Sequence, residues 1–175
     1  MKPETYHKNK KGFSLLELVV SVAIFSVILL VVISFFLSTV ASNSKTKADR
    51  EVQENSRKAL ELITYEIKGA KSIYTPTTTA NQLSLETSRY LPSDETDTFI
   101  DFFLCGTALC LKKESQNPIA LTSDDVQVAS LSFTQFLNGT KPSVQVNITV
   151  NYNSPANGNN YASVTLTSTA SLRSY

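Results

Sequence analysis

The chain has 175 residues and a formal net charge of +1, with 42% hydrophobic and 18% charged residues. This length fits one modest globular domain with a long appended segment. The charge balance excludes a strongly basic domain that coats DNA. The charges are unevenly placed, because residues 1–12 hold four lysines and one glutamate and so form a basic leader.

An apolar run, Phe13–Val40, follows this leader and carries a single charge, Glu17. No charged residue occurs from Leu18 to Ser44. As a helix the run would measure roughly 42 Å, and about 20 residues suffice to cross a bilayer core. A lone carboxylate in such a segment costs a few kcal/mol and marks a functional position by default. The alternative is a plain membrane anchor that tolerates one acid.

The basic flank predicts the orientation of this segment, because positive residues stay on the cytoplasmic side. Everything after the run is therefore expected outside the cytoplasm. A cleaved signal peptide is the alternative, with Thr39-Val40-Ala41 as its small-residue cleavage site. The run is much longer than the roughly 7–15 apolar residues of a signal peptide, which favours its retention in the mature protein.

Residues 13–68 contain neither proline nor glycine, which predicts one long helix from about Phe13 to Lys71. Beyond Ser44 the pattern becomes amphipathic, and the apolar positions recur at helical spacing. These positions are Ala48, Val52, Ala59, Leu62, Ile63, Ile67 and Ala70. A break near Ser42-Asn43-Ser44 remains open, because these residues are also good helix caps.

After Pro76 the sequence turns to short alternating segments separated by Gly, Pro, Asn and Asp. This pattern predicts an antiparallel sheet with one face covered by the apolar stripe of the helix, an α+β fold. The predicted strands are Gln82–Glu86, Thr98–Cys105, Ala108–Lys113, Ile119–Thr122, Val126–Leu137, Ser143–Tyr152 and Tyr161–Leu172. The expected parts are a leader (1–12), a membrane or filament-core helix (13–41), an amphipathic helix (42–74) and a sheet region (75–175).

The residues Lys-Gly-Phe-Ser-Leu-Leu-Glu at 11–17 resemble the amino terminus of type IV prepilins and type II secretion pseudopilins. The resemblance implies that a prepilin peptidase cuts between Gly12 and Phe13 and that Phe13 becomes N-methylated. It also implies other pilin or pseudopilin subunits, an inner-membrane assembly platform and, before assembly, membrane lipid as partners. The expected location is the inner membrane, with a single pass, and then a periplasmic or cell-surface filament.

Cleavage at Gly12 would place a cationic amine on Phe13, four residues from Glu17 and on the same helical face. Gly12 itself would let an extended backbone enter a protease cleft closely. The resemblance implies that Glu17 meets the terminal amine of a neighbouring subunit and sets the register of a filament. Pairing within one chain is the alternative that the residues leave open.

Major pilins usually carry a helix-kinking proline in this segment, whereas this chain reads Val32-Ile33-Ser34-Phe35. The absence of this proline and the order of the later strands resemble J-type minor pseudopilins and W-type minor pilins. The expected function is a minor subunit that initiates or caps a filament. A binding module at a fibre tip, contacting a surface, DNA or a secreted cargo, is the alternative; a monomeric tethered domain is a third. The best basic candidates for nucleic acid are Lys45, Lys47, Arg50, Arg57, Lys58, Lys68 and Lys71.

The only cysteines, Cys105 and Cys110, flank Gly106 in a predicted hairpin outside the cytoplasm, which favours a disulfide over two buried thiols. No metal site or cofactor is expected, because the only histidine, His7, lies in the leader. The acidic segments 94–97 and 124–125 lack calcium-loop spacing and are expected to be solvated loops. No catalytic set is apparent, so the chain is predicted to be the substrate of an enzyme rather than an enzyme.

Overall fold

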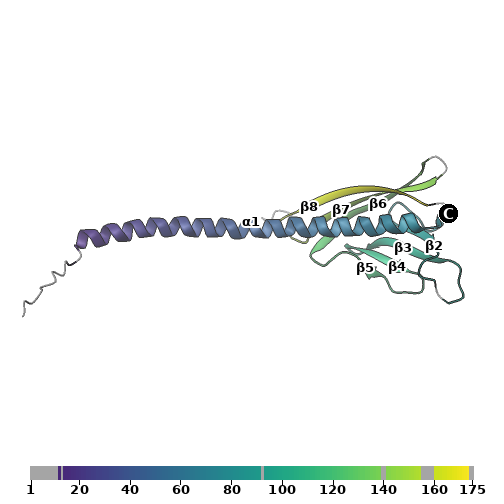
Figure 1. The fold of residues 1–175 in the computed structure, drawn as a ribbon, viewed down its shortest axis with the longest axis horizontal. Coiled ribbons are helices and arrows are strands. Elements are labelled where there is room, and N and C mark those ends of the chain that lie inside the picture. Colours follow the sequence, from purple (N-terminus) through teal and green to yellow (C-terminus); the bar gives the residue numbers. More distant parts are fainter. Residues whose placement is uncertain (1–11, 13, 92, 139–140, 155–159, 174–175) are drawn as a thin grey trace, which may run out of the picture. The chain divides into compact units, whose positions relative to one another are not determined.

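The computed structural model describes residues 12, 14–91, 93–138, 141–154 and 160–173. The chain forms two compact units, Met1–Ser42 and Asn43–Tyr175. A single helix, α1 (Leu15–Gly69), contributes to both units (Figure 1). It is helical through Ser42-Asn43-Ser44, so the break that these residues allow does not occur. The absence of proline and glycine outweighs the capping tendency of these three polar residues.

The second unit is built around the carboxyl-terminal half of α1, which buries one stripe of mainly small and aliphatic side chains. The buried positions recur every three or four residues, at some turns as adjacent pairs, as one face of a helix requires. Ile63 and Ile67 are fully buried members of the stripe. Leu62, placed in the stripe by its spacing, is only partly buried and packs against the core from the side. The buried residues of α1 are Ala48, Val52, Asn55, Ser56, Ala59, Leu60, Ile63, Glu66 and Ile67.

In the described part of the chain, eight strands follow α1, and all are paired antiparallel. They form a five-stranded sheet of order β1-β2-β3-β4-β5 and a three-stranded sheet of order β6-β7-β8. In both sheets, neighbours in space are neighbours in the chain. The strands are β1 (Ser72–Ile73), β2 (Leu83–Thr87), β3 (Thr98–Cys105), β4 (Ala108–Lys113), β5 (Ile119–Ala120), β6 (Val126–Asn138), β7 (Lys141–Tyr152) and β8 (Ser163–Ser171).

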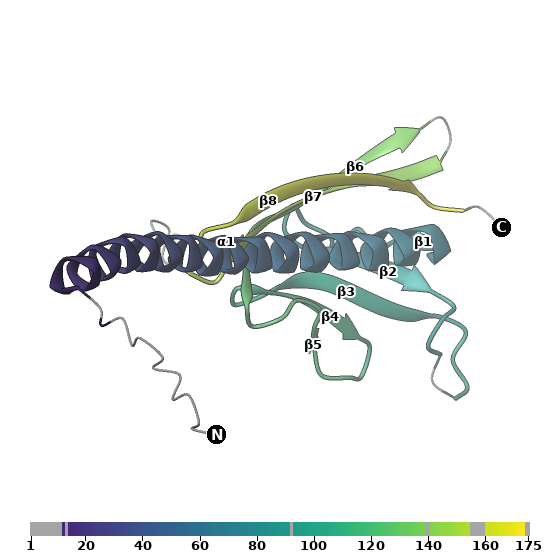
Figure 2. The same ribbon diagram turned by 60° about the vertical axis from the view of Figure 1, so that its left-hand side comes forward.

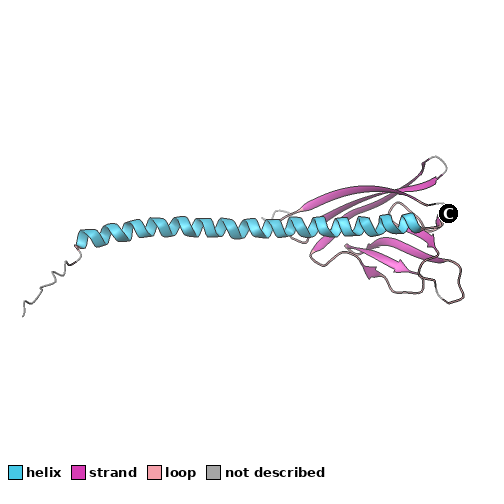
Figure 3. Ribbon diagram, viewed as in Figure 1, coloured by secondary structure: helices cyan, strands magenta, loops and turns pink. Residues whose placement is uncertain are grey.

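The helix lies between the two sheets, with β6, β7 and β8 on one side and β2 to β5 on the other (Figures 1 and 2). One continuous core includes residues from the helix and from both sheets. Ile63 of α1, Phe102 of β3 and Ile148 of β7 are fully buried in it. Antiparallel sheets around a helix confirm the predicted α+β class (Figure 3).

The division into two sheets differs from the single sheet that the strand pattern predicts. Strand β5 has only two residues, and the chain then passes α1 before β6 begins. In this connection the backbone N–H of Ser123 donates to the side-chain oxygen of the buried Asn55 at 2.9 Å. Beyond the connection, Val128 N–H donates to the Thr107 carbonyl at 2.7 Å, an isolated bond rather than a ladder. The helix therefore separates strands that the sequence pattern alone would pair.

Candidate functional site

Gly12 is the first described residue, and it is exposed. A Cβ added at this position would meet no atom within 4 Å. Packing among the described residues therefore gives no reason for a glycine here. Phe13, the predicted methylated residue, lies outside the described residues.

Glu17 lies in the first turn of α1 and is exposed. The helix starts where Leu18 N–H donates to the Ser14 carbonyl at 3.1 Å. This makes Ser14 the cap, with Glu17 three residues later, the spacing of a capping box. A carboxylate in a first turn also interacts favourably with the helix dipole. Among the described residues, no cation forms an ion pair with Glu17.

The rest of the segment presents an almost entirely apolar surface. Every residue from Ser14 to Asn43 is exposed, including large aliphatic and aromatic side chains. Several hydroxyls are satisfied inside the helix: Ser21, Ser34 and Thr39 donate to the carbonyl four residues back at 2.8–2.9 Å. Such bonding removes the cost of placing a hydroxyl in lipid. Glu17 is the only charged group on this surface.

By length and composition, α1 qualifies as a membrane-crossing helix, with a mean hydropathy of 3.1 in its most apolar 18-residue window. None of that window is buried by the rest of the described chain. An exposed apolar helix with one acid in its first turn, continued by antiparallel sheets, is a pilin-like arrangement.

A family model described as "Prokaryotic N-terminal methylation motif" matches residues 7–33. The match includes Gly12, Phe13 and Glu17, and it supports a type IV pilin-like chain, a class that is structural rather than catalytic. It implies processing by a prepilin peptidase and fits a membrane-anchored pilin. No curated protein and no solved structure matches the chain.

A polar cluster surrounds Glu66, which lies near the carboxyl end of α1 and is 1% exposed. Arg89 Nη1 lies 3.3 Å from one carboxylate oxygen, and the Tyr90 hydroxyl donates to the other at 2.8 Å. The hydrogen bond to Glu66 raises the pKa of Tyr90 above its usual value, with burial as a second cause. The Arg89 guanidinium also lies 4.3 Å from the centre of the Tyr65 ring.

Gly69 completes this cluster, because a Cβ at this position would overlap the Arg89 guanidinium. The cluster thus fixes the segment after β2 against the end of α1. Nearby, Lys71 forms a salt bridge with Asp97, and that hydrogen bond lowers the pKa of Asp97. Sequence reasoning missed the cluster, although Glu66 falls three residues after Ile63 and four before Ala70, within the spacing of the buried stripe.

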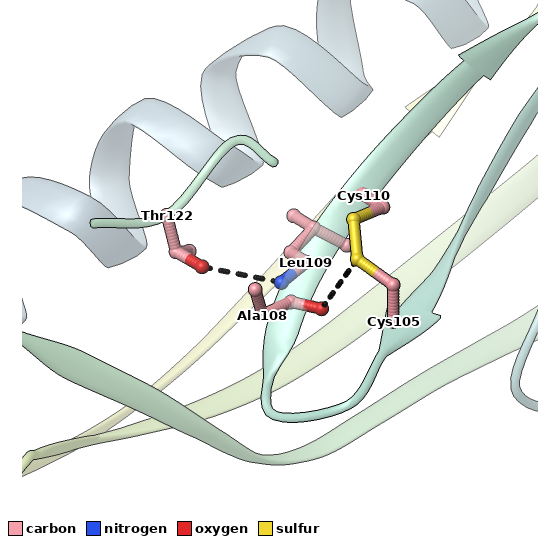
Figure 4. The surroundings of a disulfide bond; sticks show 5 residues. All are labelled: Cys105, Ala108, Leu109, Cys110 and Thr122. Carbon is pink, nitrogen blue, oxygen red and sulfur yellow. Dashed lines mark hydrogen bonds between the residues drawn. A yellow bond between two sulfur atoms is a disulfide. The ribbon is translucent and has the colours of Figure 1, made fainter. Parts of the chain in front are cut away.

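Cys105 and Cys110 are joined by a disulfide, with a Cα–Cα distance of 5.9 Å. The disulfide lies in the hairpin of β3 and β4 (Figure 4). In this hairpin Cys105 pairs with Ala108, and Phe103 pairs with Cys110. Gly106 adopts a φ of +69° at the turn, a conformation that glycine accepts at no steric cost. The Leu109 N–H donates to the Thr122 hydroxyl at 3.2 Å, which ties the hairpin to the segment after β5.

Reduction of this disulfide is expected to lower the free energy of unfolding by about 2 kcal/mol. The estimate follows from the entropy of the short loop that the bond closes in the unfolded chain. Denaturation of the oxidised and reduced full chain in detergent micelles, followed by tyrosine fluorescence, measures the difference. Equal midpoints with equal slopes would contradict it. The Cys105→Ala/Cys110→Ala double variant, insensitive to reductant, is the control.

The acidic segments show local interactions rather than convergent ligands. Asp97 is engaged by Lys71, and the Asp124 and Asp125 carbonyls accept hydrogen bonds from Asn153. Within the described ranges, no group of three or more His, Cys, Asp or Glu residues is placed to hold a metal ion.

The predicted basic residues of α1 do not form a surface of one sign. Lys58 lies 2.5 Å from Glu54, whose hydrogen bond raises the pKa of Lys58. Arg50 and Arg57 line a shallow groove together with Glu54 and Glu61. Because acids alternate with these bases, the helix face lacks the concentrated positive charge that binds nucleic acid.

Proposed function

We propose that this chain is a minor pilin or pseudopilin, a subunit of a type IV pilus or a type II secretion-like filament. A prepilin peptidase would cut it between Gly12 and Phe13 and methylate Phe13. The apolar helix would hold the subunit in the membrane and then pack in the filament core. Its role would be initiation or assembly of the filament tip, together with other subunits and an inner-membrane platform.

The observation that carries this proposal is the single exposed carboxylate of Glu17, in an otherwise uncharged helical surface within the matched motif. A segment that served only as a membrane anchor would not require this acid, which is energetically costly in lipid. The amine that cleavage would create gives it a partner of opposite charge. The continuity of α1 without a proline kink favours a minor subunit over an abundant shaft pilin.

Intact-mass analysis of the protein from its host tests the processing step. We expect a mature form that starts at Phe13 and carries one additional methyl group. A strain without prepilin peptidase should retain residues 1–12. Retention of these residues in cells with active peptidase would contradict the proposal, as would cleavage at another position.

The alternative of a nucleic-acid-binding tip module is less well supported, because acids intersperse the basic residues of α1. It predicts binding of the full chain to DNA with a strong salt dependence. Binding that stays unchanged between low and high salt, or no binding, would eliminate it.

A further inference from the structure

The edges of the two sheets differ in how they are protected from pairing with another strand. The outer strands of the five-stranded sheet, β1 and β5, have two residues each. Strand β6 carries a register shift between Val128 and Ser130. Its edge is also engaged, since Val128 N–H donates to the Thr107 carbonyl and Phe133 N–H to the Ala80 carbonyl. Short strands, bulges and covered edges are the usual protections of natural sheets.

Strand β8 shows none of these protections. It runs for nine residues, Ser163–Ser171, without charge, proline or glycine. Its pairing with β7 is regular along its whole length. Among the described strands, β8 therefore offers the longest unengaged edge of regular sheet.

The pairing with β7 identifies the backbone groups at this free edge. Tyr152 N–H donates to the Ala162 carbonyl, and Leu172 N–H donates to the Pro142 carbonyl. In an antiparallel pair, hydrogen-bonded residues alternate with residues whose N–H and C=O point away. The even-numbered residues of β8 therefore bond to β7, and Thr165, Thr167 and Thr169 direct their backbone groups outward. All three threonines are exposed.

A groove runs beside this edge, between β8 and α1. Its floor includes Leu166 and Ser168 of β8 and Leu60 and Tyr65 of α1, and its volume is about 560 Å³. Thr64 and Ser168 hydroxyls, 3.3 Å apart, fix the helix under the even-numbered face of β8. Three charged residues, Arg57, Glu61 and Lys68, also line the groove, and in the described part of the chain none of them forms a salt bridge.

We propose that the edge of β8 is a strand-addition site for an extended segment of a partner protein. The outward N–H and C=O groups at Thr165, Thr167 and Thr169 would bond to its backbone and extend the three-stranded sheet. Alternate side chains of the segment would lie in the groove over Leu60 and Tyr65 and should be apolar. The two bases Arg57 and Lys68 outnumber the acid Glu61 in the groove, which disfavours a positively charged segment. This site goes beyond the proposed function, because it requires neither processing nor Glu17.

The probe is a peptide with the sequence of β7, residues 143–151, whose alternation already fits a neighbour of β8. We expect it to bind the full chain in detergent micelles and to slow hydrogen exchange at Thr165, Thr167 and Thr169. Directly opposed residues of antiparallel strands have their side chains on the same face of the sheet. The apolar residues of the peptide, which face the groove, would therefore lie opposite the even-numbered residues of β8. Gln145, Asn147 and Thr149 of the peptide would then lie opposite the odd-numbered residues and bond to β8 through their N–H groups.

Two N-methylated peptides provide the matched control. Methylation at Gln145, Asn147 and Thr149 should lower affinity by about fivefold for each lost hydrogen bond, whereas methylation at Val146, Ile148 and Val150 should preserve binding. In the protein, Thr167→Pro removes one outward N–H, a change that edge strands tolerate, and should also weaken binding. The absence of peptide binding at about 1 mM, an equal effect of both methylation patterns, or exchange protection elsewhere would overturn the proposal.

Discussion

Replacement of Glu17 by valine is expected to leave cleavage after Gly12 intact but to lower incorporation into filaments by at least about tenfold. The valine would leave the terminal amine unpaired where water is excluded, which costs a free energy of a few kcal/mol. A cost of about 1.4 kcal/mol already corresponds to a tenfold change. The valine fits the apolar surface, so the membrane-bound precursor should accumulate normally. The ratio of assembled to membrane-bound protein in sheared-filament and membrane fractions measures the effect.

Glu54→Val provides the matched control for this experiment. It is the same substitution on the same helix, but Glu54 is 57% exposed and paired only with Lys58. Exposed pairs of this kind contribute little. Incorporation of Glu17→Val equal to that of Glu54→Val would eliminate the register role. Loss of cleavage in Glu17→Val would instead place Glu17 in recognition by the peptidase.

Replacement of Arg89 by alanine is expected to lower the free energy of unfolding by about 2–3 kcal/mol, because it leaves the Glu66 carboxylate buried with only Tyr90 as a partner. Breaking a fully buried pair costs about 3–5 kcal/mol, and the estimate is reduced because Arg89 is 35% exposed. Urea denaturation of the full chain in detergent micelles measures the change. In a Glu66→Gln background the same replacement should cost less than about 1 kcal/mol, since no charge is left unpaired.

Gly69→Ala gives an independent test of the same cluster. In the native chain it should destabilise, because the new Cβ displaces the Arg89 guanidinium. In the Arg89→Ala background this overlap disappears, and alanine should stabilise the end of the helix by up to about 1 kcal/mol. A reversal of sign between the two backgrounds is therefore expected. Equal effects in both would show that Arg89 does not explain the glycine.

The sequence was sufficient to predict the elements whose signals are local. The absence of proline and glycine across 13–68 predicts α1, which spans Leu15–Gly69. Turn residues predict the first and last residues of β3 and β4 as the structure has them. The α+β class follows from the change in hydrophobic period after Pro76. The motif around Gly12 and Glu17 is likewise a property of contiguous residues.

Features that depend on distant residues could not be predicted in this way. Strand β1 has two residues and exists only because Ser72 and Ile73 pair with Glu86 and Leu85. Glu66 appears as one more acid of an amphipathic helix until Arg89 is brought to it. The free edge of β8 depends on the order of strands in the sheet, which alternation does not encode.

The sequential order of both sheets has a consequence for how the chain folds during synthesis. Each strand pairs with its predecessor, so either sheet can close as its last strand emerges, without waiting for distant chain. The buried stripe of α1, however, is made before every strand that covers it. Until β8 is complete, part of this stripe remains an exposed apolar surface, and it is preceded along the helix by the exposed, mainly apolar residues 14–43. The interval between its synthesis and the closure of the second sheet is therefore when the nascent chain is most prone to misassociate.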